Sequence, residues 1–175
     1  FEAEDGIRVL VRSRGLGEVY KGQEGLKDHM TDEPIRPAAT VVLWRESAQG
    51  PQVLMGQRGE GAVFMPSKFV FPGGRVDAED HAAARPGFLS PDCARRLSLM
   101  APQDAPPPEV LVAAALRELT EETGLNLAAL EHPSLRFIFR AITPPGRTRR
   151  FHARFLLAPA DGLAGDRNAF ATASG

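Results

Sequence analysis

The chain has 175 residues, enough for one domain with a sizeable core, and its hydrophobic and charged fractions of 43% and 25% are ordinary for a globular protein. Its net charge of −1 gives no bulk attraction to nucleic acid or membrane surfaces, and no apolar run reaches the roughly 18 residues of a membrane-spanning helix. We therefore expect neither nucleic acid nor a membrane as a partner. The only cysteine, Cys93, excludes an internal disulfide and fits a reducing compartment, so we expect a cytoplasmic protein.

The two ends of the sequence lack the patterns of the middle. Residues 1–29 have scattered glycines, no sustained period and no signal peptide, and Met30 directly precedes the first convincing strand. We interpret residues 1–29 as a non-native or disordered extension. Residues 161–175 have the composition of a loop, rich in Ala, Gly and Asp, which we interpret as incomplete. The folded domain is therefore expected within residues 30–160.

Three strands are predicted in the first half of this domain. Residues 38–44 are a continuous apolar run with β-branched residues, typical of a buried strand. A turn separates them from residues 52–58, which we predict to be the hairpin partner. Residues 68–74 are predicted to form a short strand that ends at Pro-Gly-Gly.

The second half is predicted to hold a long helix and two strands. Residues 81–108 are rich in Pro and Ala, with one short helix expected around residues 91–100. A helix is predicted from Glu109 to Thr123, followed by strands over residues 135–143 and 149–158. The helix prediction rests on an apolar stripe at spacings of three and four, on Pro108 in its first turn and on Gly124 just past its end. This order predicts an α+β fold with a mixed or antiparallel sheet.

Three glutamates share one face of the predicted long helix. Glu118, Glu121 and Glu122 are three and four residues apart, a spacing at which each like-charged pair costs a few tenths of a kcal/mol. Arg117 can reach Glu121, but one arginine cannot neutralise three acids. A divalent cation can, and hard carboxylate oxygens suit Mg²⁺ or Mn²⁺. The alternative is a solvated acidic helix edge without a ligand.

Two segments together resemble the Nudix box, residues 71–80 ("FPGGRVDAED") and residues 114–125 ("AALRELTEETGL"). Gly74 matches the opening glycine of the box. The second half matches without a miss at Arg117, Glu118, Leu119, Glu121, Glu122, Gly124 and Leu125. This resemblance identifies the chain as a member of the Nudix family.

The box departs from the family pattern at two points. Asp80 stands where the first glutamate belongs, and 36 residues, from His81 to Leu116, replace the usual seven. Such an insertion is tolerable because the cost of loop closure grows slowly with length. It is a candidate lid or specificity element at residues 81–108, and the alternative is a disordered surface insertion.

The resemblance implies the Nudix fold, an α/β/α sandwich with a mixed β-sheet, and hydrolysis of a nucleoside diphosphate linked to another group. It implies Mg²⁺ or Mn²⁺ as cofactor, held by Glu118, Glu121, Glu122 and the main-chain carbonyl of Gly73. The expected catalytic residues are Glu118, Glu121 and Arg117, with Arg117 orienting a glutamate. The general base stays open between a box glutamate and an acid of a later loop, where Asp161 and Asp166 are candidates.

A set of basic and box residues is expected to contact the substrate. Guanidinium groups bind phosphates through forked hydrogen bonds, which favours the arginines outside the box. His152 alternates with two phenylalanines in its predicted strand and is interpreted as structural. The expected substrate-binding residues are Arg58, Gly74, Asp80, Arg149 and Arg150.

The finer resemblance is to the Nudix branch that includes the animal peroxisomal coenzyme A diphosphatase. It rests on residues 64–74 and 142–158, although that branch has Asp where this chain has His152, and Ser67 replaces a glycine of the coenzyme A signature. The resemblance implies coenzyme A or an acyl derivative as substrate and leaves room for a homodimer. The alternatives are ADP-ribose, a nucleotide sugar or a dinucleotide. A non-catalytic domain that senses a nucleotide is a third reading, against which the intact glutamates argue.

Overall fold

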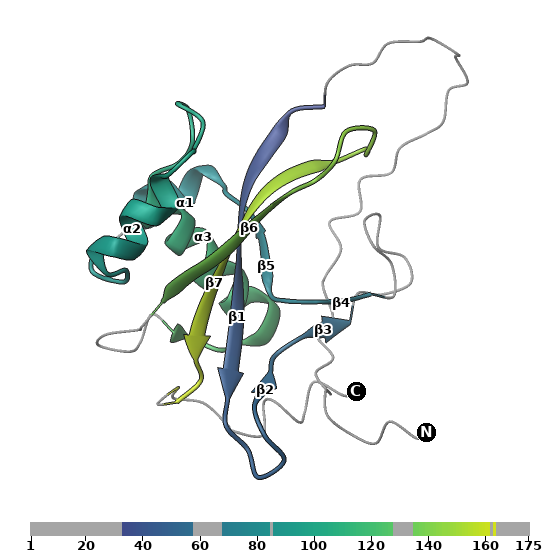
Figure 1. Cartoon of the computed structure of the whole chain (residues 1–175), viewed down its shortest axis with the longest axis vertical. Helices are drawn as coiled ribbons and strands as arrows, with labels where there is room; N and C mark the ends of the chain where they lie inside the picture. Colours follow the sequence, from purple (N-terminus) through teal and green to yellow (C-terminus); the bar gives the residue numbers. More distant parts are fainter. Residues whose placement is uncertain (1–32, 58–67, 85, 128–134, 162, 164–175) are drawn as a thin grey trace.

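The structure is a computed structural model, and it describes residues 33–57, 68–84, 86–127, 135–161 and 163. Its centre is a five-stranded sheet with the order β2–β1–β7–β6, in which β5 also pairs with β1 (Figure 1). The five strands are β1 (Ile35–Arg45), β2 (Gln52–Val53), β5 (Gly73–Arg75), β6 (Arg136–Ile142) and β7 (Arg150–Pro159). The pairing of β1 with β7 is parallel and the other pairings are antiparallel, so the predicted mixed sheet is confirmed.

Two predicted strands are each divided in the structure. The hairpin partner predicted over residues 52–58 pairs with β1 only at β2, after which β3 (Gly56–Gln57) pairs with β4 (Phe69–Val70) in a separate two-stranded sheet. The prediction that the next strand ends at Pro-Gly-Gly is wrong, because Gly73 begins β5. A Cβ on Gly73 would lie 2.5 Å from Thr40 Oγ1 on β1, so the absent side chain is what lets β5 approach β1.

The long helix α3 (Pro108–Thr123) agrees with the predicted helix. Proline occupies its first turn, where no intrahelical N–H bond is lost. Gly124 ends it in the left-handed conformation, with a φ of 73°, and its N–H donates to the Thr120 carbonyl at 2.8 Å. Both ends of the helix are therefore set by local sequence.

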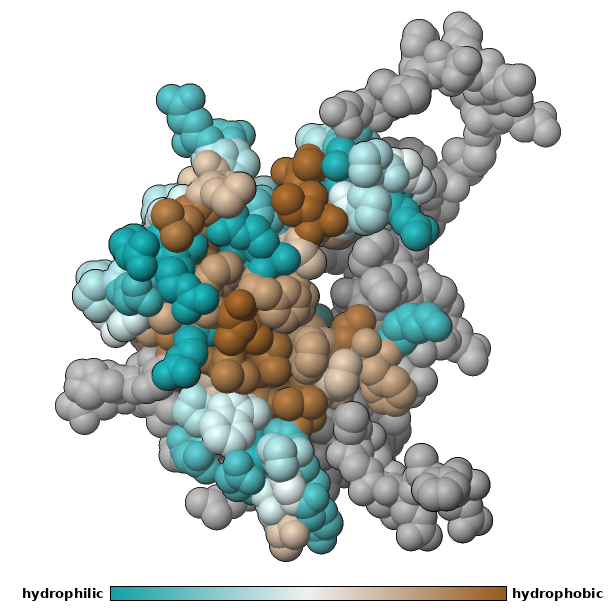
Figure 2. Space-filling model, viewed as in Figure 1, coloured by the Kyte–Doolittle hydropathy of each residue, from teal (hydrophilic) through white to brown (hydrophobic). Residues whose placement is uncertain are grey.

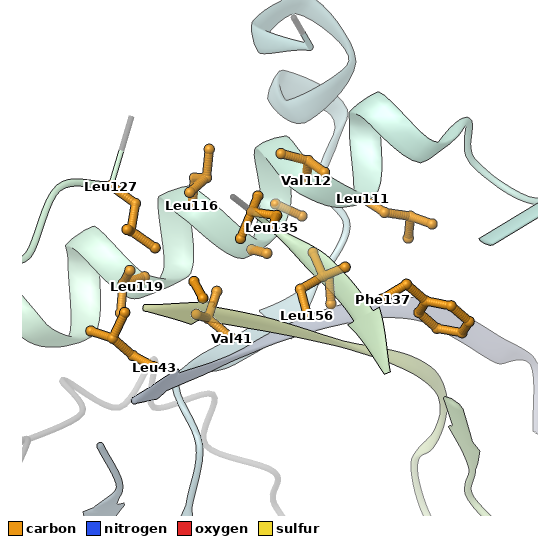
Figure 3. Packing of buried hydrophobic residues seen from close by; sticks show 14 of the residues in the cluster. Val41, Leu43, Leu111, Val112, Leu116, Leu119, Leu127, Leu135, Phe137 and Leu156 are labelled. Atoms are coloured by element: carbon orange, nitrogen blue, oxygen red, sulfur yellow. The ribbon is translucent and has the colours of Figure 1, made fainter. Parts of the chain in front are cut away.

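The apolar stripe of α3 packs on the central strands of the sheet. Four of these side chains are 0% exposed and belong to one hydrophobic cluster: Leu119 of the helix and Val41, Leu43 and Leu156 of the strands. Figure 3 shows these side chains in the layer between α3 and the sheet. Because the glutamates lie beside this stripe, burial of the stripe also fixes where the glutamates point.

Two short helices lie in the region of the insertion, one across its start and one within it. The first, α1 (Ala78–Ala83), was not predicted, whereas α2 (Pro91–Ser98) agrees with the short helix expected around residues 91–100. The Ser90 hydroxyl caps α2 by accepting from the Cys93 N–H at 3.2 Å. Arg140 of β6 donates to the Leu99 carbonyl at 2.6 Å, which ties the end of α2 to the sheet. This part of the insertion is therefore an ordered component of the fold.

Leu97 of α2 is 1% exposed and lies in the hydrophobic cluster, so the insertion contributes to the core. Leu97→Ala is expected to lower the free energy of unfolding by about 2–5 kcal/mol. Leu99→Ala, at a side chain that is 49% exposed, should change it by less than about 0.5 kcal/mol. Urea denaturation of both variants tests this, and equal losses would show that α2 does not pack as described.

The three helices gather on one side of the sheet in Figure 1, and apolar side chains lie on the opposite face. On that face Phe139 stacks on Phe155 with ring centroids 4.1 Å apart, and Phe139 is 47% exposed. Figure 2 shows apolar residues gathered over the middle of the molecule, where Figure 1 places the sheet. The second helical layer of an α/β/α sandwich would cover such a face, but the described residues contain none. No described helix is long and apolar enough to cross a membrane.

Candidate active site

The short strand β5 turns part of its backbone toward α3. In the antiparallel pairing with β1, Val41 donates to the Pro72 carbonyl and Val76 donates to the Pro37 carbonyl, each at 2.9 Å. Gly73 lies opposite Thr40 of β1, in a pair that exchanges no backbone hydrogen bonds directly. Alternation along an antiparallel pair therefore directs its N–H and C=O away from β1. The N–H donates to Glu122 Oε2 at 3.1 Å, so the free edge of β5 faces a box glutamate.

Glu118 lies against the next residue of the same strand. A Cβ added to Gly74 would overlap the Glu118 carboxylate, so the close approach of helix and strand requires glycine at this position. The Glu118 side chain is 16% exposed. Burial raises the pKa of Glu118 above its usual value, and the adjacent Arg117 partly opposes this rise. The two glycines of β5 thus place two carboxylates at one edge of the sheet.

Arg117 connects the acids of the box. Its Nε and Nη2 donate to the two carboxylate oxygens of Asp80 at 2.9 and 3.0 Å. Its Nη1 donates to Glu118 Oε1 at 3.0 Å and to Glu121 Oε2 at 3.3 Å. The hydrogen bond to Asp80 raises the pKa of Arg117 above its usual value. One permanently charged guanidinium thus holds three acidic side chains in place.

Asp80 is placed to orient Arg117. Its side chain is 1% exposed, and besides the two bonds from Arg117 it accepts from the Asp77 N–H at 2.7 Å, as part of the capping box of α1. This geometry favours a positioning role over the direct substrate contact predicted from the sequence. The unpredicted helix α1 is what brings this carboxylate under the guanidinium.

Asp80→Asn keeps the shape of the side chain but removes the charge that two donors of Arg117 meet. We expect a loss of about 1.5–3 kcal/mol in stability, the usual worth of a charged hydrogen bond, and about a tenfold loss of turnover as Arg117 loosens. Asp92→Asn is the matched control, because Asp92 pairs with Arg95 at 2.6 Å where both side chains are more than half exposed. Equal effects of the two variants on melting temperature would contradict the assignment.

The remaining predicted substrate contacts are separate from this cluster. Arg58 lies outside the described residues. Arg149 is exposed at the end of the β6–β7 hairpin, and Arg150 is buried at the start of β7, where its Nε donates to the Thr143 carbonyl at 3.2 Å. Arg150 pairs with Ile35, four residues or about 13 Å along β1 from the position level with Gly74. The two hairpin arginines therefore lie well away from the glutamates.

The box donors are chemically suited to a hard divalent cation. Glu118, Glu121 and Glu122 offer only carboxylate oxygens, and the Gly73 carbonyl points to the same edge as its N–H. Among the described residues, however, no three His, Cys, Asp or Glu side chains are close enough together to hold a metal ion. Arg117 and the Gly73 N–H engage the carboxylates instead. Glu121 is 58% exposed, so it is the ligand candidate with most freedom to turn.

Comparison with known proteins bears on this site. No protein-family model matches the chain, and no curated protein matches it. Among solved structures, a Nudix hydrolase from Alicyclobacillus acidocaldarius is 28% identical and has a TM-score of 0.59, with 75% of this chain and 72% of that chain covered. The chain has the Nudix fold. The second half of the box is intact in this fold, and the match supports a hydrolase that acts on diphosphate bonds.

Two other solved structures are more distantly similar to this chain. A MutT/Nudix family protein from Enterococcus faecalis is 20% identical, with 82% of this chain and 43% of that chain covered and a TM-score of 0.47. The Ap4A hydrolase of C. elegans is 17% identical, with 75% of this chain and 74% of that chain covered and a TM-score of 0.42. These two similarities are too low to inform the substrate.

Proposed function

We propose that the chain is a Mg²⁺-dependent or Mn²⁺-dependent Nudix hydrolase that cleaves the diphosphate linkage of a nucleoside diphosphate derivative. The observation that carries this is the contact of α3 with β5, in which Glu118 lies over Gly74 and Glu122 accepts from the Gly73 N–H. Glu118, Glu121, Glu122 and the main-chain carbonyl of Gly73 would hold the metal. When bound, the metal neutralises diphosphate charge and activates water.

The chain's own groups orient the reacting carboxylates. Arg117 holds Glu118 and Glu121 through a single nitrogen, so the two acids keep a defined separation until substrate enters. Burial raises the pKa of Glu118 when no metal is bound, and a bound divalent cation would oppose this rise. We therefore propose Glu118 and Glu121 as the catalytic acids and Arg117 as the residue that orients them.

Within this class we propose coenzyme A or an acyl derivative as the substrate. A cavity of about 420 Å³ lies between the insertion and the outer face of α3. Its walls are mainly apolar and include Phe88 of the insertion and Val112, Ala113 and Leu116 of the helix, while Arg117 of the box also borders it. A long uncharged arm such as pantetheine suits these walls better than a compact sugar does.

Product analysis with a panel of diphosphates tests both levels of this proposal. Coenzyme A, ADP-ribose, a nucleotide sugar and a dinucleoside polyphosphate are each incubated with and without Mg²⁺, with Glu121→Gln as the inactive control. Metal-dependent cleavage that prefers coenzyme A is the expected result. Cleavage of other diphosphates but not of coenzyme A would exclude coenzyme A as the substrate and still support a diphosphate hydrolase. Saturable binding without turnover of any member would favour a nucleotide sensor.

Ala113→Leu tests whether the cavity receives the substrate's arm. The added side chain should raise KM for coenzyme A by about tenfold and leave KM for ADP-ribose within about twofold, because only the longer substrate loses binding space. The same substitution at Ala82, which is exposed on α1, is the control. An unchanged KM for coenzyme A in Ala113→Leu would exclude the cavity as part of the site.

A further inference from the structure

The β6–β7 hairpin is strongly basic in a nearly neutral protein. Residues 136–160 contain six arginines and one histidine and no aspartate or glutamate, whereas the whole chain has a net charge of −1. The hairpin end, residues 144–149, is exposed, and the basic side chains continue from it along β7 into the protein. Such a one-sided distribution of charge attracts anions.

The inner end of this series is a buried arginine without a matching acid. Arg154 is 1% exposed, and its Nη1 donates to the His152 carbonyl at 2.8 Å. Among the described residues its Nε has no hydrogen-bond partner, and neither does Nε2 of His152, a residue that is 6% exposed. In the described part of the chain no carboxylate forms an ion pair with Arg154. A buried charge left in this state costs several kcal/mol.

The neighbours of Arg154 increase this cost. Arg140 lies directly opposite on β6, and its Nη1 and Nη2 donate to the carbonyls of Met100 and Leu99. Burial, followed by the charge of Arg140, lowers the pKa of Arg154 below its usual value. The pKa of His152 is lowered by burial and by both arginines. The attraction of an anion between these groups would offset both the desolvation penalty and the repulsion.

The strand register relates this pair to the box. Ala39 of β1 pairs with Gly74 on one side and with Arg154 on the other, so the three residues form a row on one face of the sheet. Glu118 lies over Gly74 on that same face. Two strand spacings amount to about 10 Å, so Arg154 begins about that far from the box glycine. This distance is short compared with the length of an extended nucleoside diphosphate derivative.

We propose that His152 and Arg154 bind a phosphate-type oxyanion, and that this oxyanion is a peripheral phosphate group of the substrate, beyond the diphosphate that is cleaved. The unpartnered Nε–H of Arg154 and the Nε2 of His152, when it carries a proton, are the two donors. The second half of the proposal rests on the proposed function. The first half concerns binding alone.

Thermal unfolding in phosphate tests the binding site without reference to turnover. The melting temperature of the intact chain should rise with inorganic phosphate beyond its rise with chloride at equal ionic strength. Arg154→Met should abolish that extra rise while the protein stays folded, since an apolar side chain tolerates burial. Arg136→Met removes the same charge from an exposed position on β6 and should keep the rise.

A second variant supplies the missing anion internally. His152→Asp places a carboxylate beside Arg154, so it should raise the melting temperature in phosphate-free buffer and lose the response to phosphate. The site is overturned if the intact chain shows no phosphate-specific rise, or if Arg154→Met retains it in full. Chloride and phosphate acting alike in every variant would show general screening only.

Turnover of a matched pair then distinguishes a substrate phosphate from a free one. Coenzyme A and 3′-dephospho-coenzyme A differ by one phosphate, and the intact chain should show a KM about tenfold lower for the former. Arg154→Met should equalise the two KM values with kcat for the dephosphorylated form unchanged. If the variant does not alter the ratio of the two KM values, the phosphate of the substrate is excluded as the ligand of Arg154. A free oxyanion then remains as the ligand. Failure of both substrates to turn over would count against the proposed function, while the phosphate response would still test the site.

Discussion

Glu118→Gln is expected to abolish most of the metal-dependent activity while leaving the protein at least as stable as before. Outer partners of metal ligands alone are worth 10–100-fold in activity, so the loss of a ligand charge should cost at least about a hundredfold. Stability should not fall, because the buried carboxylate is disfavoured in the folded state, as its raised pKa shows. Steady-state kinetics with Mg²⁺ and thermal unfolding without it measure the two effects.

The dependence on pH separates this explanation from a general change in structure. Because the pKa of Glu118 is raised in the folded state, its contribution to stability is fully present at low pH and is lost as pH rises through that pKa. Glu118→Gln should therefore be more stable than the parent at neutral pH and equal to it at low pH. Glu79→Gln, at an exposed position of α1, should change neither activity nor this profile. Full Mg²⁺-dependent turnover in Glu118→Gln would refute the metal assignment.

Gly74→Ala is expected to reduce turnover by a similar factor without touching any box acid. The added methyl group overlaps the Glu118 carboxylate, so the carboxylate must leave its place against β5. A displacement of about 1 Å at a catalytic group can cost about a hundredfold in rate. The loss should appear in kcat and persist at saturating Mg²⁺ and substrate, because the acid is moved and its charge is kept.

The double variant Gly74→Ala/Glu118→Gln shows whether both changes act through one carboxylate. If they do, the double variant should be no slower than the slower single variant, since the second change removes something already lost. If the loss of turnover in the double variant is the product of the two single losses, Gly74→Ala acts at a place other than the Glu118 carboxylate, for example on the pairing of β5 with β1. Circular dichroism of all three variants should match the parent.

Local patterns in the sequence were sufficient for α3 and its acidic face. The helix carries its own start and stop signals in Pro108 and Gly124, and both stand where they were expected. The spacing of Glu118, Glu121 and Glu122 follows from helical geometry alone. The family resemblance added the fold and the partner glycines, and the structural match at 28% identity agrees with the fold. The helix and the spacing of its acids depend on residues close together in sequence.

Other features depended on pairs of residues far apart in sequence. The sequence shows Pro-Gly-Gly as a strand breaker, but it does not show that Gly73 pairs with β1. That pairing requires an unpaired edge on β1, which only the assembled sheet provides. Helix α1 was missed because six residues carry too little periodicity, yet it places Asp80 under Arg117 across 37 positions. The sequence predicts Asp80 as a substrate contact, whereas its burial in the structure indicates that it positions Arg117.

The sequence by itself determined the chemistry of the site, since residue types and helical spacing are enough to put three carboxylates and a guanidinium on one face. Only the tertiary structure decided which groups meet that face. Strand pairing brought the free edge of β5 to the glutamates and set Arg154 on the same side of the sheet, two strands away. The alternation of His152 with phenylalanines predicts a structural role. Alternation shows which side of the sheet a residue faces, but it does not show whether a hydrogen-bond partner lies on that side. Burial of a polar atom without a hydrogen-bond partner is a property of the packed chain, and among the described hairpin arginines it is found at Nε of Arg154.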